Sequence, residues 1–145
     1  LHLCDRRQRQ MCIRDRDKID WTPYKGFVYT FDETKDIAWL YLVSDMLITD
    51  YSSVMFDYSI LNRPMLFFAY DLEDYKENLR GFYFDFVNDI PGPISRDTDQ
   101  LIKDIKEYNE DSWKEKYKNY HDKFNGIDDG HASQKVIDVI KKVSR

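Results

Sequence analysis

The chain has 145 residues, of which 42% are apolar, so it is long enough to bury the core of one ordinary domain. Its formal net charge of −5 argues against nonspecific nucleic-acid binding, which depends on clustered basic side chains. Its apolar runs are all shorter than the roughly 20 residues that a membrane-spanning helix needs.

Residues 1–16 differ in composition from the rest of the chain. They hold five arginines against two aspartates, and also both cysteines, Cys4 and Cys12, whose spacing fits no metal site. Cysteine usage of this kind favours a reducing, cytoplasmic setting. One interpretation is a basic arm that contacts an anionic surface. We favour another, in which residues 1–16 are a non-native or disordered leader that packs against nothing and residues 17–145 form the domain.

Strand and helix patterns alternate from residue 27 onward. The β-rich run 27–31 predicts a strand, and the apolar periodicity over 32–43 predicts an amphipathic helix. A short apolar strand is expected at 46–49, and a helix over 52–61. The apolar run 65–70 is typical of a strand that is buried on both faces.

The remaining residues predict one long loop and three helices. The loop spans 71–95, and its P-G-P turn and its aromatic residues favour an ordered, functional loop. The three helices are expected over 97–108, 112–124 and 132–143.

Strands separated by helices predict an α/β fold with a Rossmann-like parallel sheet, in which the strands at 46–49 and 65–70 are neighbours. In such sheets ligands bind beyond the carboxyl ends of the strands. This rule places residues 49–53 and 70–72 on the ligand-facing edge.

The most informative segment is S-D-M-L-I-T-D-Y-S-S-V-M-F-D, at residues 44–57. It predicts a strand that ends at Thr49, a short turn, and a helix with Ser52 or Ser53 as N-cap. The first N–H groups of such a helix suit a phosphate, and the two serines add hydroxyls. Asp57 lies one helical turn after Ser53 and suits a ribose or polyol hydroxyl. The alternative is that the serines are only a helix cap.

Five sequence blocks occur in the order that one known family shows. They are T-D-Y-S-S-V-M-F-D-Y, R-P-M-L-F-F-A-Y-D-L-E-D-Y, R-G-F-Y-F-D-F, I-P-G-P-I and K-F-N-G-I-D-D-G-H-A-S. Over residues 27–143 the chain thereby resembles the C-terminal domain of the CDP-glycerol glycerophosphotransferases, which are the polymerases and primases of teichoic acid.

The resemblance implies that the chain is the C-terminal half of a GT-B type two-domain enzyme. Such an enzyme transfers glycerol phosphate or ribitol phosphate from a CDP-alditol to a growing teichoic acid chain. By position, the site for CDP-glycerol or CDP-ribitol would include Thr49, Ser52, Ser53 and Asp57. The domain that brings the acceptor and a histidine base is absent. Residues 17–145 would therefore be a truncated donor-binding domain, inactive alone and without a catalytic residue of its own.

The resemblance also implies partners and a location. The acceptor would be teichoic acid on a lipid carrier. The protein would associate peripherally with the cytoplasmic face of the cell membrane, through parts that this chain lacks. Neither a cofactor nor a metal is expected, because the acidic residues are scattered as on an ordinary acidic surface. No triad spacing with a serine and an acid is readable for the histidines His2, His121 and His131.

Arg80, in R-G-F-Y-F-D, is a further candidate for binding the donor, because arginine recognises phosphate bidentately. Its structural alternative is a salt bridge with Glu77 or Asp85. Two other functions stay open for the chain: a nucleotide-sugar glycosyltransferase of the GT-B type, and a non-catalytic nucleotide-binding module. The sequence distinguishes neither a glycerol from a ribitol donor nor a primase from a polymerase.

Overall fold

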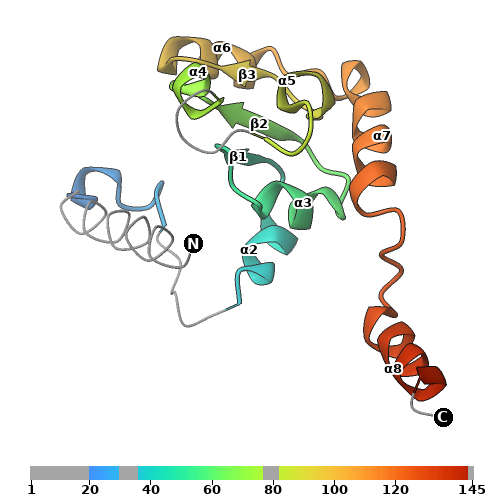
Figure 1. Cartoon of the computed structure of the whole chain (residues 1–145). Coiled ribbons are helices and arrows are strands. Elements are labelled where there is room, and N and C mark those ends of the chain that lie inside the picture. The colour runs from blue at the N-terminus through green and yellow to red at the C-terminus, as the bar shows by residue number, and fades with distance from the viewer. Residues whose placement is uncertain (1–19, 30–35, 77–81, 144–145) are drawn as a thin grey trace. The chain divides into compact units, whose positions relative to one another are not determined.

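The computed structural model describes residues 20–29, 36–76 and 82–143 (Figure 1). The chain divides into two compact units, Leu1–Asp36 and Ile37–Arg145, and each is described by itself. The expected leader, residues 1–16, lies outside the described residues, and so does Arg80.

The described part of the first unit is a single 3-10 turn, η1 (Thr22–Tyr24), followed by one bridge between Lys25 and Val28. The chain reverses through Gly26, whose φ of 87° costs a glycine little. The strand expected over 27–31 is therefore wrong for residues 27–29, and residues 30 and 31 lie outside the described part.

Among its described residues, the second unit has a sheet of three parallel strands that follow one another in sequence order: β1 (Leu47–Thr49), β2 (Met65–Phe68) and β3 (Ile94–Ser95). Leu47 pairs with Met65, and Phe67 pairs with Ile94. The α/β class is confirmed, and the two strands that the sequence predicts as neighbours are adjacent and parallel. The central strand β2 is almost wholly buried, as its apolar sequence predicts.

Two short helices flank β1: α2 (Ala38–Val43) precedes it and α3 (Val54–Ser59) follows it. The guanidinium of Arg63 fixes the end of α2. It donates to the carbonyl oxygens of Tyr41, Leu42 and Ser44 at 3.2, 2.9 and 2.7 Å. The Tyr41 carbonyl also accepts from the Ser44 N–H, and carbonyl groups at the C-terminus of a helix carry partial negative charge, so the cation stabilises the end of α2.

The segment 71–95 is not the long loop that the sequence predicts. Its described residues form α4 (Leu72–Asp74), α5 (Phe86–Asp89) and β3. The prediction fails because elements of two to four residues are too short to show a periodic pattern. Gly92 of the P-G-P segment is buried against β2, where a Cβ atom would lie 1.8 Å from the carbonyl oxygen of Met65.

The three helices predicted for the end of the chain are confirmed as α6 (Thr98–Lys106), α7 (Lys114–Phe124) and α8 (Ala132–Val143). A 3-10 turn, η3 (Glu110–Ser112), precedes α7. α6 packs against β2 and β3, and α7 packs against α3. α7 buries Tyr117 and Tyr120, whereas every residue of α8 is exposed. No helix among the described residues is long and apolar enough to cross a membrane.

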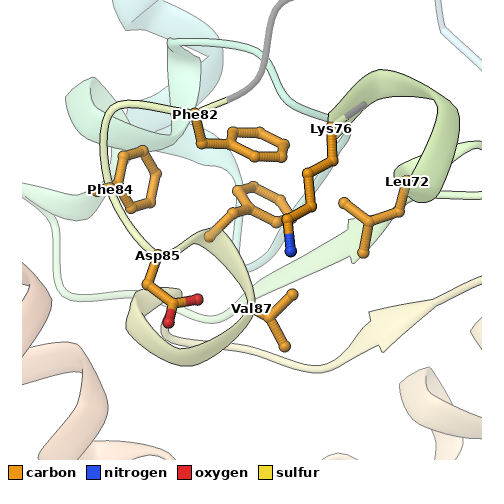
Figure 2. A pocket seen from close by; sticks show the side chains of 7 residues that line it. Leu72, Lys76, Phe82, Phe84, Asp85 and Val87 are labelled. Atoms are coloured by element: carbon orange, nitrogen blue, oxygen red, sulfur yellow. The ribbon is translucent and has the colours of Figure 1, made fainter. Parts of the chain in front are cut away.

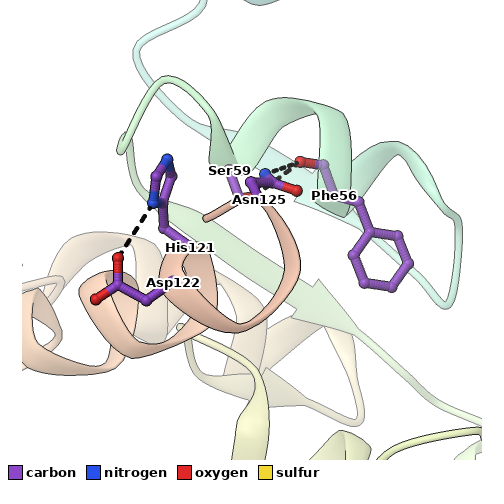
Figure 3. A network of polar contacts seen from close by, with 5 residues as sticks. All are labelled: Phe56, Ser59, His121, Asp122 and Asn125. Carbon is purple, nitrogen blue, oxygen red and sulfur yellow. Dashed lines mark hydrogen bonds and ion pairs between the residues drawn. The ribbon is translucent and has the colours of Figure 1, made fainter. Parts of the chain in front are cut away.

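A buried polar side chain at the end of α7 ties that helix to α3 (Figure 3). Asn125 donates from Nδ2 to the carbonyl oxygen of Phe56 at 2.8 Å and to the hydroxyl of Ser59 at 2.5 Å. The neighbouring contact between His121 Nδ1 and the carboxylate of Asp122, at 3.5 Å, is more exposed. Because both acceptors of Asn125 lie on α3, α7 helps to set the position of α3 and of the turn before it.

Candidate functional site

The predicted site residues lie where β1 ends at the carboxyl edge of the sheet. Thr49 is the last residue of β1, Ser52 and Ser53 belong to the turn that follows, and Asp57 lies in the first turn of α3. Thr49 and Ser52 are half-buried, whereas Ser53 and Asp57 are exposed. The structure thus places four of the five predicted residues on one short stretch of the edge. The fifth, Arg80, is not among the described residues.

Most polar groups of this turn already have partners within the chain. The carboxylate of Asp50 accepts from the Ser52 N–H at 2.9 Å, and the hydroxyl oxygen of Ser52 accepts a long bond from the Val54 N–H at 3.5 Å. Ser53 occupies the N-cap position of α3, but its side chain makes no capping hydrogen bond. The prediction that Ser52 or Ser53 is the N-cap residue is therefore confirmed for Ser53, although Ser53 makes no side-chain capping bond and that of Ser52 is long.

Ser53 is the exception in the turn. Counting only partners in the described part of the chain, neither its N–H nor its hydroxyl has a hydrogen bond. The N–H groups of Met55 and Phe56 are used, because they donate to the carbonyl oxygens of Ser52 and Ser53. The predicted anion site at the start of α3 would thus have fewer free N–H groups than the four of an ideal helix, and it would centre on Ser53.

Sequence reasoning missed Tyr51, which lies in the same turn. Its hydroxyl donates to the carboxylate of Asp71 at 2.8 Å, and its ring stacks on Tyr75 with centroids 4.1 Å apart. Desolvation, and then the hydrogen bond to Asp71, raise the pKa of the Tyr51 hydroxyl above its ordinary value of 10.0. The hydroxyl therefore stays protonated and keeps donating at neutral pH. No local pattern reveals a pair of residues that lie 20 positions apart.

A pocket of about 360 Å³ lies beside the turn (Figure 2) and is lined by Leu72, Lys76, Phe82, Phe84, Asp85, Phe86 and Val87. Phe82 and Phe86 also contact the ring of Tyr51, at centroid distances of 5.6 and 5.5 Å, so the pocket and the turn share a wall.

The two charged residues of this pocket have different roles. Asp85 accepts from the side-chain amide of Asn88 at 2.7 Å, which lowers the pKa of its carboxyl, and it caps α5 by accepting from the Asn88 backbone N–H at 3.3 Å. The ammonium of Lys76 points into the pocket (Figure 2), and it is the one cation among the lining residues. Sequence reasoning missed Lys76 as well, because a single lysine in a polar segment carries no pattern.

The remaining candidates belong to other parts of the second unit. The His131 N–H donates to the carboxylate of Asp129 at 3.0 Å, and Lys135 pairs with the same carboxylate at 3.0 Å. These contacts organise the start of α8. Within residues 20–29, 36–76 and 82–143, no three acidic, histidine or cysteine side chains are grouped so that they could hold a metal ion.

Residues 12–142 match the family model described as CDP-Glycerol:Poly(glycerophosphate) glycerophosphotransferase. The teichoic acid poly(glycerol phosphate) polymerase of Bacillus subtilis (strain 168) is 44% identical over 128 residues, which are 87% of this chain and 17% of that polymerase. The teichoic acid poly(ribitol-phosphate) polymerase of Bacillus spizizenii is 44% identical over 127 residues, which are 81% of this chain and 18% of that polymerase.

A solved structure gives the same result. The wall teichoic acid polymerase TagF matches with a TM-score of 0.78 and 42% identity, over 90% of this chain and 32% of that chain. The chain therefore spans less than a third of the length of these relatives.

Proposed function

Because the chain belongs to the CDP-glycerol:poly(glycerophosphate) glycerophosphotransferase family, we propose that it forms the donor-binding part of a transferase that extends teichoic acid with glycerol phosphate or ribitol phosphate. The observation that carries the proposal is Ser53. It is exposed at the carboxyl edge of the sheet, and its N–H and hydroxyl have no partner among the described residues. This is the edge at which parallel α/β sheets bind ligands.

In this proposal the donor pyrophosphate lies against Ser52 and Ser53. Asp57, one helical turn later, accepts a hydrogen bond from a hydroxyl of the alditol or the ribose, and Thr49 lines the site where β1 ends. Arg80 enters the same site only through the likeness of its R-G-F-Y-F-D block to the family. A carboxylate repels phosphate and attracts hydroxyl donors, so Ser53 suits the pyrophosphate and Asp57 suits a hydroxyl of the alditol or the ribose on either side of it.

The reaction of the whole transferase is a phosphoryl transfer. An acceptor hydroxyl oxygen bonds to the β-phosphorus of the donor, the bond from that phosphorus to the bridging oxygen breaks, and CMP leaves. The acceptor proton passes to a base outside this chain. The residues described here contribute by holding the donor in place and by stabilising charge on the phosphate oxygens.

We place the acceptor, a teichoic acid chain on a lipid carrier, and peripheral contact with the cytoplasmic face of the membrane in parts of the transferase outside this chain. What supports this placement is that the matched relatives are teichoic acid polymerases in which more than two thirds of the length lies outside the matched segment. Their equal identity, 44% for a glycerol and for a ribitol polymerase, favours neither alditol.

Isothermal titration of the chain with CDP-glycerol, CDP-ribitol and UDP-glucose tests the proposal. We expect saturable binding of at least one CDP-alditol, no binding of UDP-glucose, and no transfer by the chain alone. Preference for UDP-glucose would indicate a nucleotide-sugar glycosyltransferase instead. Binding of none of the three would contradict a donor-binding role.

A further inference from the structure

The turn that carries the two serines is attached to the next strand–helix connection by one side chain. Tyr51 lies between Asp50 and Ser52, and its hydroxyl donates to Asp71, which follows β2. This hydrogen bond of 2.8 Å therefore joins the connection after β1 to the connection after β2. Both connections lie at the carboxyl edge of the parallel sheet, where the proposed donor site is.

The ring of Tyr51 is held as firmly as its hydroxyl. It stacks on Tyr75 with an interplanar angle of 22°, and it packs against Phe82 and Phe86. Phe86 is a core residue that is only 2% exposed. Ring packing together with the hydrogen bond at its polar end restricts the rotamers open to this half-buried side chain.

The other polar groups of the turn cannot replace this attachment. The side chains of Asp50 and Ser52 bond only to backbone N–H groups two residues away, so they shape the turn without fixing it to the rest of the described structure. Ser53 has no partner among the described residues. In the described structure, Tyr51 is therefore the side chain of the turn that bonds to a distant part of the chain.

We propose that Tyr51 and Asp71 are positioning residues, which hold the turn so that Ser52 and Ser53 meet the donor pyrophosphate. The inference rests on the proposed function, since it concerns the same site. Neither residue needs to touch the donor. Their effect is indirect, because a displacement of about 1 Å in groups that bind a reacting phosphate is enough to cost much of the interaction.

The test compares donor affinity with stability in four single variants and one double variant of the chain. Tyr51→Phe removes the hydroxyl that donates the hydrogen bond and keeps the stacked ring, whereas Asp71→Ala removes the carboxylate that accepts it. Asp71→Asn keeps an acceptor oxygen and is the conservative rescue. Tyr117→Phe is the matched structural control, because it removes a tyrosine hydroxyl that bonds within the core, to Tyr108 and the Met65 N–H. Affinity for CDP-alditol is measured by titration well below each melting temperature.

We expect Tyr51→Phe and Asp71→Ala each to weaken donor binding by about tenfold, the loss of one hydrogen bond. Asp71→Asn should retain most of the affinity. Tyr117→Phe should lower the melting temperature and leave the affinity unchanged. Because the two residues act as one unit, the double variant Tyr51→Phe/Asp71→Ala should bind no more weakly than either single variant.

Wild-type affinity in Tyr51→Phe and Asp71→Ala, or additive losses in the double variant, would overturn the inference while the donor-binding function stood. An equal loss in Tyr117→Phe would also overturn it, because the effect would then follow from stability alone. If the unaltered chain binds no CDP-alditol, the proposed function fails and this inference fails with it.

Discussion

At the scale of single residues, four consecutive positions of the turn have four different tasks. Asp50 closes the turn by accepting from the Ser52 N–H, and Tyr51 attaches it to Asp71. Ser52 is half-buried and accepts from Val54, whereas Ser53 is exposed and has no partner in the described structure. The two serines look equivalent in the sequence, but only Ser53 has both its N–H and its hydroxyl without a partner in the described structure.

Substitution of Ser53 should therefore affect ligand binding far more than folding. A hydrogen bond to a charged group contributes about 1.5–3 kcal/mol. Ser53→Ala should thus weaken CDP-alditol affinity roughly 10- to 100-fold, measured by isothermal titration. The melting temperature should stay unchanged because the hydroxyl caps nothing.

Two further variants test the assignment. Ser133→Ala removes an exposed serine from α8 and should leave donor affinity at the wild-type level. Asp57→Asn, in a transferase of full length, should lower turnover more than it changes folding. If Ser53→Ala and Asp57→Asn both behave like the unaltered protein, the site assignment is wrong.

The sequence predicts the location of this turn but not the division of its tasks. A strand, a turn and a helix are local, and residues 44–57 contain all the signals for them. The bond from Tyr51 to Asp71 and the position of Lys76 in the pocket depend on tertiary packing. Such packing brings together residues at irregular separations along the chain, so no periodic pattern in the sequence predicts these contacts.

At the scale of elements, α7 carries two buried tyrosine hydroxyls, of which one has a hydrogen-bond partner in the described structure and the other has none. Tyr117 and Tyr120 are both buried, one turn apart. The Tyr117 hydroxyl accepts from the Met65 N–H at the start of β2, so it satisfies a backbone group of the central strand. The Tyr120 hydroxyl has no partner among the described residues. Burial raises the pKa of both hydroxyls, so both are neutral at physiological pH.

Removal of the Tyr117 hydroxyl and removal of the Tyr120 hydroxyl should affect the free energy of unfolding differently. Tyr117→Phe leaves a buried N–H unsatisfied and should lower the free energy of unfolding by about 1–3 kcal/mol. Tyr120→Phe removes a buried group that bonds to nothing, and it should leave stability unchanged or raise it by up to about 1 kcal/mol. Urea unfolding of both variants measures the difference, and equal losses would show that the Tyr120 hydroxyl has a partner.

The length of each helix or strand explains which elements the sequence predicts. α6, α7 and α8 are long enough for an apolar period, and β2 is a continuous apolar run, so these elements are confirmed. α4, α5 and β3 have two to four residues each and form through contacts with β2 and with the aromatic core. For elements of this size the packing decides the structure, and local sequence carries little information.

At the scale of the whole molecule, α8 has an apolar face without a cover in the described structure. Four residues one or two turns apart, Val136, Val139, Ile140 and Val143, are each more than half exposed. The family match extends over residues 12–142, so almost all of α8 belongs to the family domain. Apolar faces of this kind usually mark contacts with another part of a protein.

We therefore expect a substitution on this face to affect stability differently in the 145-residue chain and in a longer transferase that contains it. In the 145-residue chain, Ile140→Asp should change the free energy of unfolding by less than about 0.5 kcal/mol. In a transferase of the relatives' length that carries this segment, it should lower the melting temperature. Lys141→Gln, on the polar face of α8, is the control and should be neutral in both proteins. A large loss in the short chain would show that its own residues cover α8.

The close approach of Gly92 to β2 also has a consequence for how sequence variation is interpreted. Because a Cβ atom would fall 1.8 Å from the Met65 carbonyl oxygen, no side chain fits at this position without moving the central strand. A scan of all substitutions would return glycine alone at position 92, although the residue lies in the packed interior. Intolerance of change in the P-G-P segment would thus record the geometry of the interior, and it would carry no information about the chemistry of the ligand.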